Sequence, residues 1–173
     1  MKIITKLPLY LGLGIFVSVI LFSAVKVGEK NNLTLIKSRA TTSGAILKMI
    51  YTSPDMVSVS FSGDKLVSGV DVVIEYEKNK ISILPSSLLS SPQFITSGGQ
   101  VNEDTGIFTF SAMAKDAAIK TGVIGTFKVV PKNKYVRETT NLKFKTGEGS
   151  SVVIDAESGK NILINTEGVQ FSL

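Results

Sequence analysis

The chain has 173 residues, of which 43% are hydrophobic and 19% charged, a balance typical of a folded domain rather than a disordered one. It contains no His, Cys or Trp. These absences exclude metal sites built from His or Cys, disulfides, and nucleophiles of the Ser-His-Asp or Cys-His type. We therefore expect a protein that is not an enzyme and that has no catalytic residue, metal or cofactor.

The net charge of +5 is concentrated near the N-terminus. Lys2, Lys6, Lys26 and Lys30 stand against Glu29 in residues 1–30, which leaves +3 there and only +2 in the rest of the chain. Nucleic-acid binding requires a basic face on the folded domain. We therefore do not expect a nucleic-acid partner.

Residues 7–25 contain no charged side chain and have lysines on both flanks. At ~1.5 Å per residue, a helix of this length spans about 28 Å, close to the ~30 Å hydrocarbon core of a bilayer. A cleaved signal peptide is the alternative, but Phe22 does not fit the small-x-small pattern of a cleavage site after Ala24. We predict an N-terminal transmembrane helix in residues 1–25, a linker in 26–44, and a single-pass cell-membrane protein whose C-terminal domain is extracellular.

Residues 45–173 show the period-2 alternation of strands that have one buried and one solvated face. In 56–62, three apolar residues alternate with serines, and 63–64 are predicted to form a turn. In 70–77, one face carries Val70, Val72, Ile74 and Tyr76, and the other carries Asp71, Val73 and Glu75. Further strands are predicted at 45–51, 81–84, 93–97, 107–113, 122–130, 142–146, 151–155, 161–164 and 169–173, with an irregular segment at 85–92. Many short strands separated by turn residues predict an all-β, antiparallel, two-sheet sandwich.

Three segments resemble the cohesin module and its relatives in the carbohydrate-binding-module superfamily. Residues 67–83 resemble the cohesin strand that ends in Tyr-Asp-Pro, with Glu77-Lys78 in place of Asp-Pro. Residues 121–130 resemble the strand that ends in Phe-Lys-Val, and 155–173 resemble the terminal strands. The resemblance implies a jelly-roll β-sandwich over residues 45–173 and a bacterial surface protein.

The resemblance also implies a partner and a site. In cohesins, one flat sheet face binds dockerin modules, which carry their own calcium. The corresponding positions here are Asp71, Val73 and Glu75, together with Lys115, where the family often has an acidic residue. The implied function is a non-catalytic, cell-surface module that attaches a dockerin-like protein.

Two other functions remain open from the residues. A polysaccharide could bind a basic cluster that surrounds a predicted hairpin, formed by Lys128, Lys132, Lys134, Arg137, Lys143 and Lys145. Within it, Lys132, Lys134 and Tyr135 are the alternative glycan-binding residues, and Tyr51 is a second candidate for an exposed aromatic ring. The third possibility is a subunit of a surface appendage, in which an edge strand pairs with a neighbour.

Two further motifs are interpreted as incidental. Ser62 and Lys65, with Lys120-Thr121-Gly122, match a penicillin-binding pattern, but that chemistry requires the serine at the start of a helix. Asp155, Glu157 and Asn161 alternate like the ligands of a calcium loop but lack the spacing of an EF-hand, which favours a polar β-turn.

Overall fold

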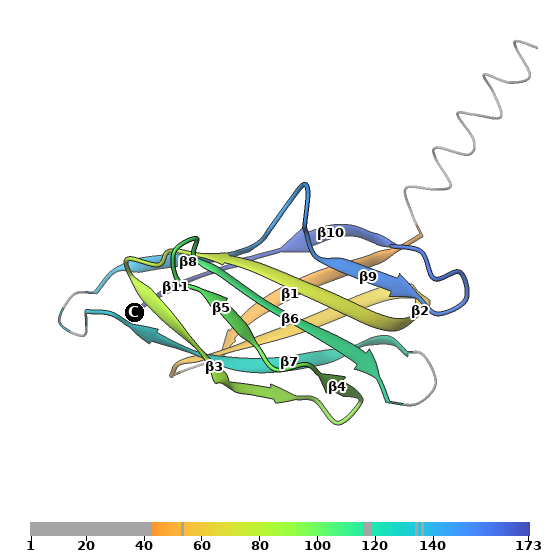
Figure 1. Ribbon diagram of the computed structural model, residues 1–173, viewed down its shortest axis with the longest axis horizontal. Coiled ribbons are helices and arrows are strands. Elements are labelled where there is room, and N and C mark those ends of the chain that lie inside the picture. The colour runs from red at the N-terminus through yellow and green to blue at the C-terminus, as the bar shows by residue number, and fades with distance from the viewer. Residues whose placement is uncertain (1–42, 53, 116–118, 134, 136) are drawn as a thin grey trace, which may run out of the picture. The chain divides into compact units, whose positions relative to one another are not determined.

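The computed structural model describes residues 43–173 apart from 53, 116–118, 134 and 136 (Figure 1). The predicted transmembrane helix in 1–25 and most of the linker in 26–44 lie outside the described residues. Within the described part, no helix is long and apolar enough to cross a membrane. Residues from Ser43 to Leu173 form one compact unit.

This unit is built from strands alone in its described part. In chain order they are β1 (Ala45–Thr52), β2 (Met56–Tyr76), β3 (Ile81–Ser90), β4 (Phe94–Thr96), β5 (Gln100–Asn102), β6 (Ile107–Ala114), β7 (Ile119–Pro131), β8 (Thr139–Phe144), β9 (Val152–Asp155), β10 (Leu163–Glu167) and β11 (Val169–Ser172).

The strands form two layers, and β2 belongs to both. The first part of β2 lies between β1 and β7, with β10 outside β1 and β3 outside β7. The second part of β2 lies between β6 on one side and β9 and β8 on the other; β4 and β5 pair with β6, and β11 pairs with β8. All these pairs are antiparallel except β1–β10, which is parallel and departs from the predicted all-antiparallel arrangement.

The core confirms the predicted alternation along β2. Val57, Val59 and Phe61 are buried in the first layer, and Val70, Val72, Ile74 and Tyr76 are buried in the second. All aromatic residues predicted for the core are buried, namely Phe61, Tyr76, Phe108, Phe110, Phe127, Phe144 and Phe171. Packing joins distant strands: the rings of Phe108 and Phe127 lie 4.9 Å apart, and those of Phe61 and Phe94 5.9 Å apart.

The turn predicted at 63–64 is wrong, because β2 runs through these residues and only its register shifts between Ser62 and Val67. Gly63 serves a close approach rather than a turn. A Cβ at this position would lie 2.9 Å from the carbonyl oxygen of Gly44, at the start of β1. The close approach of the two backbones at this point leaves no room for a side chain, so the position requires glycine.

Two smaller differences concern the middle of the chain. The segment predicted as irregular at 85–92 continues β3 as far as Ser90, although its pairing with β7 is interrupted between Leu84 and Leu89. The short strand β5 was not expected, because its three residues carry no alternation that sequence could reveal.

Candidate functional site

The outer face of the second layer carries the residues that the resemblance singled out. We call it the β2–β6 face. Asp71 and Glu75 are exposed and Val73 is partly buried, and their neighbours across the strand are Ser111, Ile107 and Thr109. Directly opposite residues in an antiparallel pair project from the same side of a sheet. The face therefore also includes Met113 on β6, Ile95 on β4, Gln100 on β5, Val152 and Ile154 on β9, and Lys143 on β8.

The centre of this face is polar and ordered by hydrogen bonds. The Ser111 hydroxyl donates to Asp71 Oδ1 over 2.6 Å. The Ser111 amide in turn donates to the Ser97 hydroxyl over 2.8 Å, and the Ser97 amide donates to the Ser111 carbonyl. A shallow hollow of about 160 Å³ lies over these residues and Val73. The carboxylate of Asp71 is thus oriented, yet it stays accessible from solvent.

One end of the face is apolar. Met113 and Ile95 are a cross-strand pair and are 60% and 54% exposed. Contiguous exposed apolar area marks interaction surfaces, and this pair supplies the apolar contact area of the face. Sequence alternation alone did not single them out, because it cannot show that two such side chains are neighbours on adjacent strands.

The opposite end of the face is charged, and the strand that pairs with β2 changes there from β9 to β8. β9 pairs with β2 through Asp71, and β8 pairs with it from Ile74 onwards. Between them, the buried Ser151 accepts a hydrogen bond from the Val73 amide at 2.9 Å and donates to the Val73 carbonyl. This hydroxyl keeps the sheet continuous where the loop between β8 and β9 interrupts it. Glu75 and Lys143 then face each other across the strands.

Lys115 lies just beyond β6, two residues past Met113. Its side chain is exposed, and its amide donates to the Gln93 carbonyl at 3.0 Å. The structure thus brings Asp71, Val73 and Glu75 together on one surface and places Lys115 at the limit of that surface.

The alternative glycan-binding residues lie on the connection between β7 and β8. Lys132 is exposed and Tyr135 is 98% exposed, whereas Lys134 lies outside the described residues. The hairpin predicted for this region is wrong, because β7 pairs with β2 and β3 while β8 pairs with β2 and β11.

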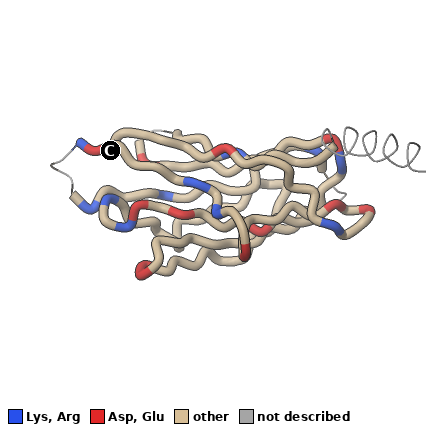
Figure 2. Tube along the Cα trace, turned by 90° about the horizontal axis from the view of Figure 1, so that it is seen from above, with Lys and Arg blue, Asp and Glu red and all other residues tan. Residues whose placement is uncertain are grey.

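The predicted basic cluster is consequently dispersed. Lys128 forms an ion pair with Asp55 at 3.2 Å, and Lys143 and Lys145 lie in the other layer. Figure 2 shows positively and negatively charged positions intermixed over the trace. Tyr51 is not an exposed ring, because it stacks on Phe171 with centroids 4.1 Å apart.

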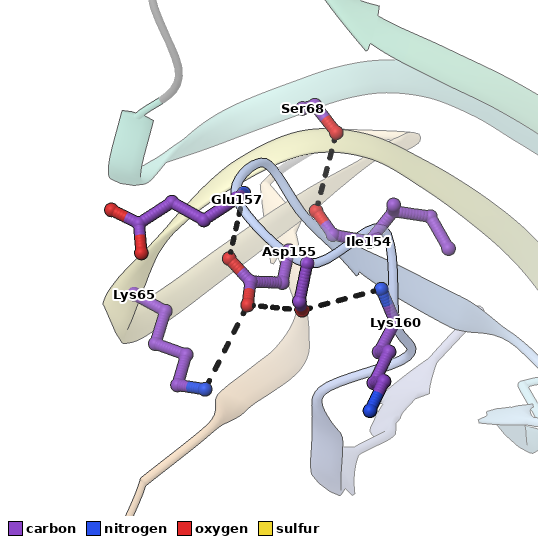
Figure 3. Close-up of polar contacts among 7 residues, drawn as sticks. Lys65, Ser68, Ile154, Asp155, Glu157 and Lys160 are labelled. Carbon is purple, nitrogen blue, oxygen red and sulfur yellow. Dashed lines mark hydrogen bonds and ion pairs between the residues drawn. The ribbon is translucent and has the colours of Figure 1, made fainter.

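The turn at 155–161 is confirmed as a structural turn. Asp155 is only 4% exposed and accepts hydrogen bonds from the Ser158 hydroxyl and the Glu157 amide, while Lys65 approaches from β2 at 3.7 Å (Figure 3). These partners lower the pKa of Asp155, the Ser158 hydrogen bond having the largest effect. Among the residues that the structure describes, no group of acidic side chains could hold a metal ion.

The penicillin-binding pattern also has a structural explanation. Ser62 and Thr121 are opposite each other on β2 and β7, which brings the two halves of the pattern together. Ser62, however, is in a strand and Lys65 is engaged with Asp155, so neither has the required arrangement.

Comparison with known proteins identifies the architecture. No protein-family model and no curated protein matches the chain. Among solved structures, a cohesin module from a Clostridium perfringens family 33 glycoside hydrolase superposes with a TM-score of 0.58 at 12% identity, covering 76% of this chain and 96% of that one. The fold is that of cohesins.

Two more cohesins support this assignment. A non-cellulosomal cohesin from the archaeon Archaeoglobus fulgidus matches with a TM-score of 0.55 at 13% identity, over 75% of this chain and 91% of that one. A cohesin solved in a type I cohesin–dockerin complex from Clostridium thermocellum matches with a TM-score of 0.53 at 11% identity, over 74% and 90%. The resemblance in sequence therefore predicted the cohesin fold correctly.

Proposed function

We propose that this chain is a non-catalytic binding module and that its β2–β6 face docks a folded protein partner of the dockerin type. The observation that carries the proposal is the combination of an oriented Asp71 with the exposed pair Met113 and Ile95 on one sheet face. Productive protein interfaces combine apolar contact area with a few charged groups that fix register.

The distribution of side chains suggests what the partner presents. Apolar side chains would meet Met113 and Ile95, and a hydrogen-bond donor or a cation would meet Asp71 near the centre. Support for the dockerin type comes from the solved neighbour that was crystallised with a dockerin. The face contains Asp71, Val73 and Glu75, the β2 residues that the resemblance to cohesins implies for partner binding.

We also propose that the domain works at a bacterial cell surface, held by a transmembrane helix in residues 1–25 with residues 45–173 outside. The support is the uncharged stretch 7–25 with lysines on both flanks. A tethered position suits a module that attaches another protein to the envelope.

The second candidate function is binding of an acidic polysaccharide by Lys132, Lys134 and Tyr135. The observation in its favour is the almost complete exposure of Tyr135 on the same loop as the exposed Lys132. Aromatic rings that are free to stack, next to a positive charge, suit charged sugars.

The deciding experiment compares two charge reversals in the full chain. Binding to a panel of purified dockerin modules and to an array of acidic polysaccharides is measured for the wild type, Asp71→Lys and Lys132→Glu. We expect Asp71→Lys to weaken dockerin binding at least tenfold, about 1.4 kcal/mol, because like charges then meet at the contact. Its cost to folding should be below about 1 kcal/mol, since the position is exposed.

Lys132→Glu is the matched control and should leave dockerin binding unchanged. The polysaccharide hypothesis requires the reverse pattern, with loss at Lys132 and none at Asp71. Dockerin binding that is unaffected by Asp71→Lys and by Met113→Asp would remove the β2–β6 face as the docking surface.

A further inference from the structure

A second candidate surface lies where the two layers separate, between β8 and β10. The end of β8 is paired on one side only, because β11 pairs with β8 up to Leu142 and then leaves it at Gly168. A Cβ on Gly168 would lie 2.5 Å from the Leu142 carbonyl oxygen. The corner between β10 and β11 therefore packs directly on the backbone of β8 at this glycine. Beyond this corner β10 pairs with β1 and with no other described strand.

The backbone direction shows which groups of β8 are left free. The Lys145 amide donates to the Val73 carbonyl of β2 at 2.9 Å. Backbone groups alternate in direction along an antiparallel strand, so the amide and carbonyl of Phe144 point away from β2, toward β10. No described strand pairs with Phe144 on that side. Within β8, this leaves the backbone of Phe144 unpaired on that side, at the end of the strand, and an unpaired strand end is a place where another strand can add.

The edge opens into a groove large enough for a ligand. A hollow of about 420 Å³ lies between β8 and the corner from β10 to β11, lined by residues that include Phe144, Thr146, Thr166 and Val169. A second hollow of about 290 Å³ shares Thr146 and Thr166 with it and continues toward Ile164. Pockets of 300–1,000 Å³ are typical of ligand sites.

The charge of the groove has one sign. Among the described residues that line the two hollows, the charged ones are Lys143 and Lys145, and none is acidic. Neither lysine forms an ion pair with another described residue, although Glu75 lies across the strand from Lys143. Glu167, the acidic residue of β10, is held by Lys48 at 2.9 Å. The groove is therefore complementary to an acidic occupant.

Strand periodicity specifies the occupant further. Lys143 belongs to the outer face with Glu75, and Lys145 follows it by one strand period, whereas Leu142 and Phe144 are buried. A strand added beside β8 would place alternate side chains next to the two lysines and the intervening ones against the apolar floor. An alternation of carboxylate and apolar side chains satisfies both.

We propose that this groove binds an extended peptide segment that alternates acidic and apolar residues, by strand addition to the free edge of β8. The site lies on the far side of β8 from β2. It shares Lys143 with the charged end of the β2–β6 face, but Asp71, Met113 and Ile95 do not line it. The proposal does not depend on the proposed function. An acidic peptide is favoured over an acidic polysaccharide, because a free strand edge offers backbone hydrogen bonds that a sugar chain does not match in spacing.

The test uses the full chain and a labelled eight-residue peptide that alternates Glu or Asp with Val or Thr. Affinity is measured by fluorescence anisotropy, and the contact is mapped by amide chemical shifts in NMR spectra. We expect saturable binding, with shifts at Phe144, Thr146 and Thr166. Lys145→Glu should weaken binding at least tenfold, whereas Lys132→Glu, at an exposed lysine outside the groove, should change it less than twofold.

Two further probes separate strand addition from simple charge attraction. A peptide of the same sequence with N-methyl groups at alternate residues, so that the hydrogen bonds to β8 are lost, should bind at least tenfold more weakly. Asp71→Lys should leave the peptide affinity unchanged, which distinguishes this site from the docking surface. The wild-type spectra remain decisive if a variant fails to fold.

Several results would overturn the proposal. Absence of saturable binding would mean that Lys143 and Lys145 only protect an exposed strand edge. Equal affinity of the N-methylated peptide, or of a linear polyanionic polysaccharide that shifts the same amides, would assign the lysines to charge attraction alone. Concentration-dependent self-association that shifts these amides without peptide would assign the groove to a second copy of the chain.

Discussion

Asp155 shows how a single side chain can join segments that are far apart in sequence. Its carboxylate accepts hydrogen bonds from Ser158 and Glu157 within its own turn and pairs with Lys65 on β2. The same turn is fixed by the Ala156 amide, which donates to the Leu66 carbonyl at 2.8 Å. The residue thus anchors the turn between β9 and β10 to the point where β2 passes between layers.

These contacts predict a pH-dependent contribution to stability. The Ser158 hydrogen bond, the Glu157 amide and Lys65 lower the pKa of Asp155 below its ordinary value of 3.8. Because the unfolded chain binds this proton at higher pH than the folded protein, Asp155 stabilises the fold fully above about pH 5. This contribution is lost as the pH falls through the folded-state pKa. Asp155→Asn should therefore flatten the decline of the free energy of unfolding below pH 5, measured by urea denaturation.

Asp104→Asn, at an exposed turn, is the matched control and should keep the wild-type pH profile. Part of the slope should persist in Asp155→Asn, because Lys80, Asn141 and Thr140 also lower the pKa of Glu77. A wild-type profile that is identical to that of Asp155→Asn would show that Asp155 contributes nothing in this pH range.

At the scale of the element, β2 organises the fold, because its 21 residues pass from one layer to the other. Its first part pairs with β1 and β7, and its second part with β6, β8 and β9. The crossing begins at Gly63, which pairs with Ala45 at the start of β1 and lies close to its backbone. The geometry of the whole sandwich therefore depends on a few residues in the middle of one strand.

The close approach at the crossing predicts that alanine substitution lowers the free energy of unfolding at Gly63 but not at Gly98. A Cβ on Gly63 would meet the Gly44 oxygen at 2.9 Å and the Ala45 Cα at 3.2 Å, whereas a Cβ on Gly98 would meet nothing within 4 Å. Gly63→Ala should destabilise the protein by about 1–3 kcal/mol, because backbone must move to admit the methyl group. Gly98→Ala should be neutral or slightly stabilising, since it restricts only the unfolded chain. Equal free energies of unfolding for the two variants, from chemical denaturation, would contradict this account of the crossing.

At the scale of the whole molecule, the proposed anchor determines where the binding surfaces act. The uncharged stretch 7–25 is long enough to span a bilayer, and Phe22 disfavours cleavage after Ala24. N-terminal sequencing and intact mass of the protein from a membrane fraction should show residues 1–25 retained. Protease added to intact cells should remove the domain, because we place it outside. A mature chain that begins near Val25, or a domain protected in intact cells, would contradict the proposed anchoring.

The sequence by itself determined which side chains are buried along most strands. Strand alternation is local, so Val70, Val72 and Ile74 could be assigned to the core and Asp71 and Glu75 to the outer face without knowing any strand partner. The same local pattern, with the resemblance to cohesins, was sufficient for the fold class, an all-β sandwich of the cohesin type. For the candidate site, the resemblance implied Asp71, Val73 and Glu75 on β2, together with Lys115.

Only the tertiary structure decided which strands are neighbours, because pairing joins residues that are distant in the chain. It showed that β2 runs through both layers, that β7 and β8 do not form a hairpin, and that Tyr51 stacks on Phe171. It also placed the exposed Met113 and Ile95 on the same face as Asp71 and left the backbone of Phe144, at the edge of β8, without a described partner strand. Alternation specifies the face on which a side chain lies, but the neighbours on that face, and the edges left open, depend on register and chain crossings that no local pattern contains.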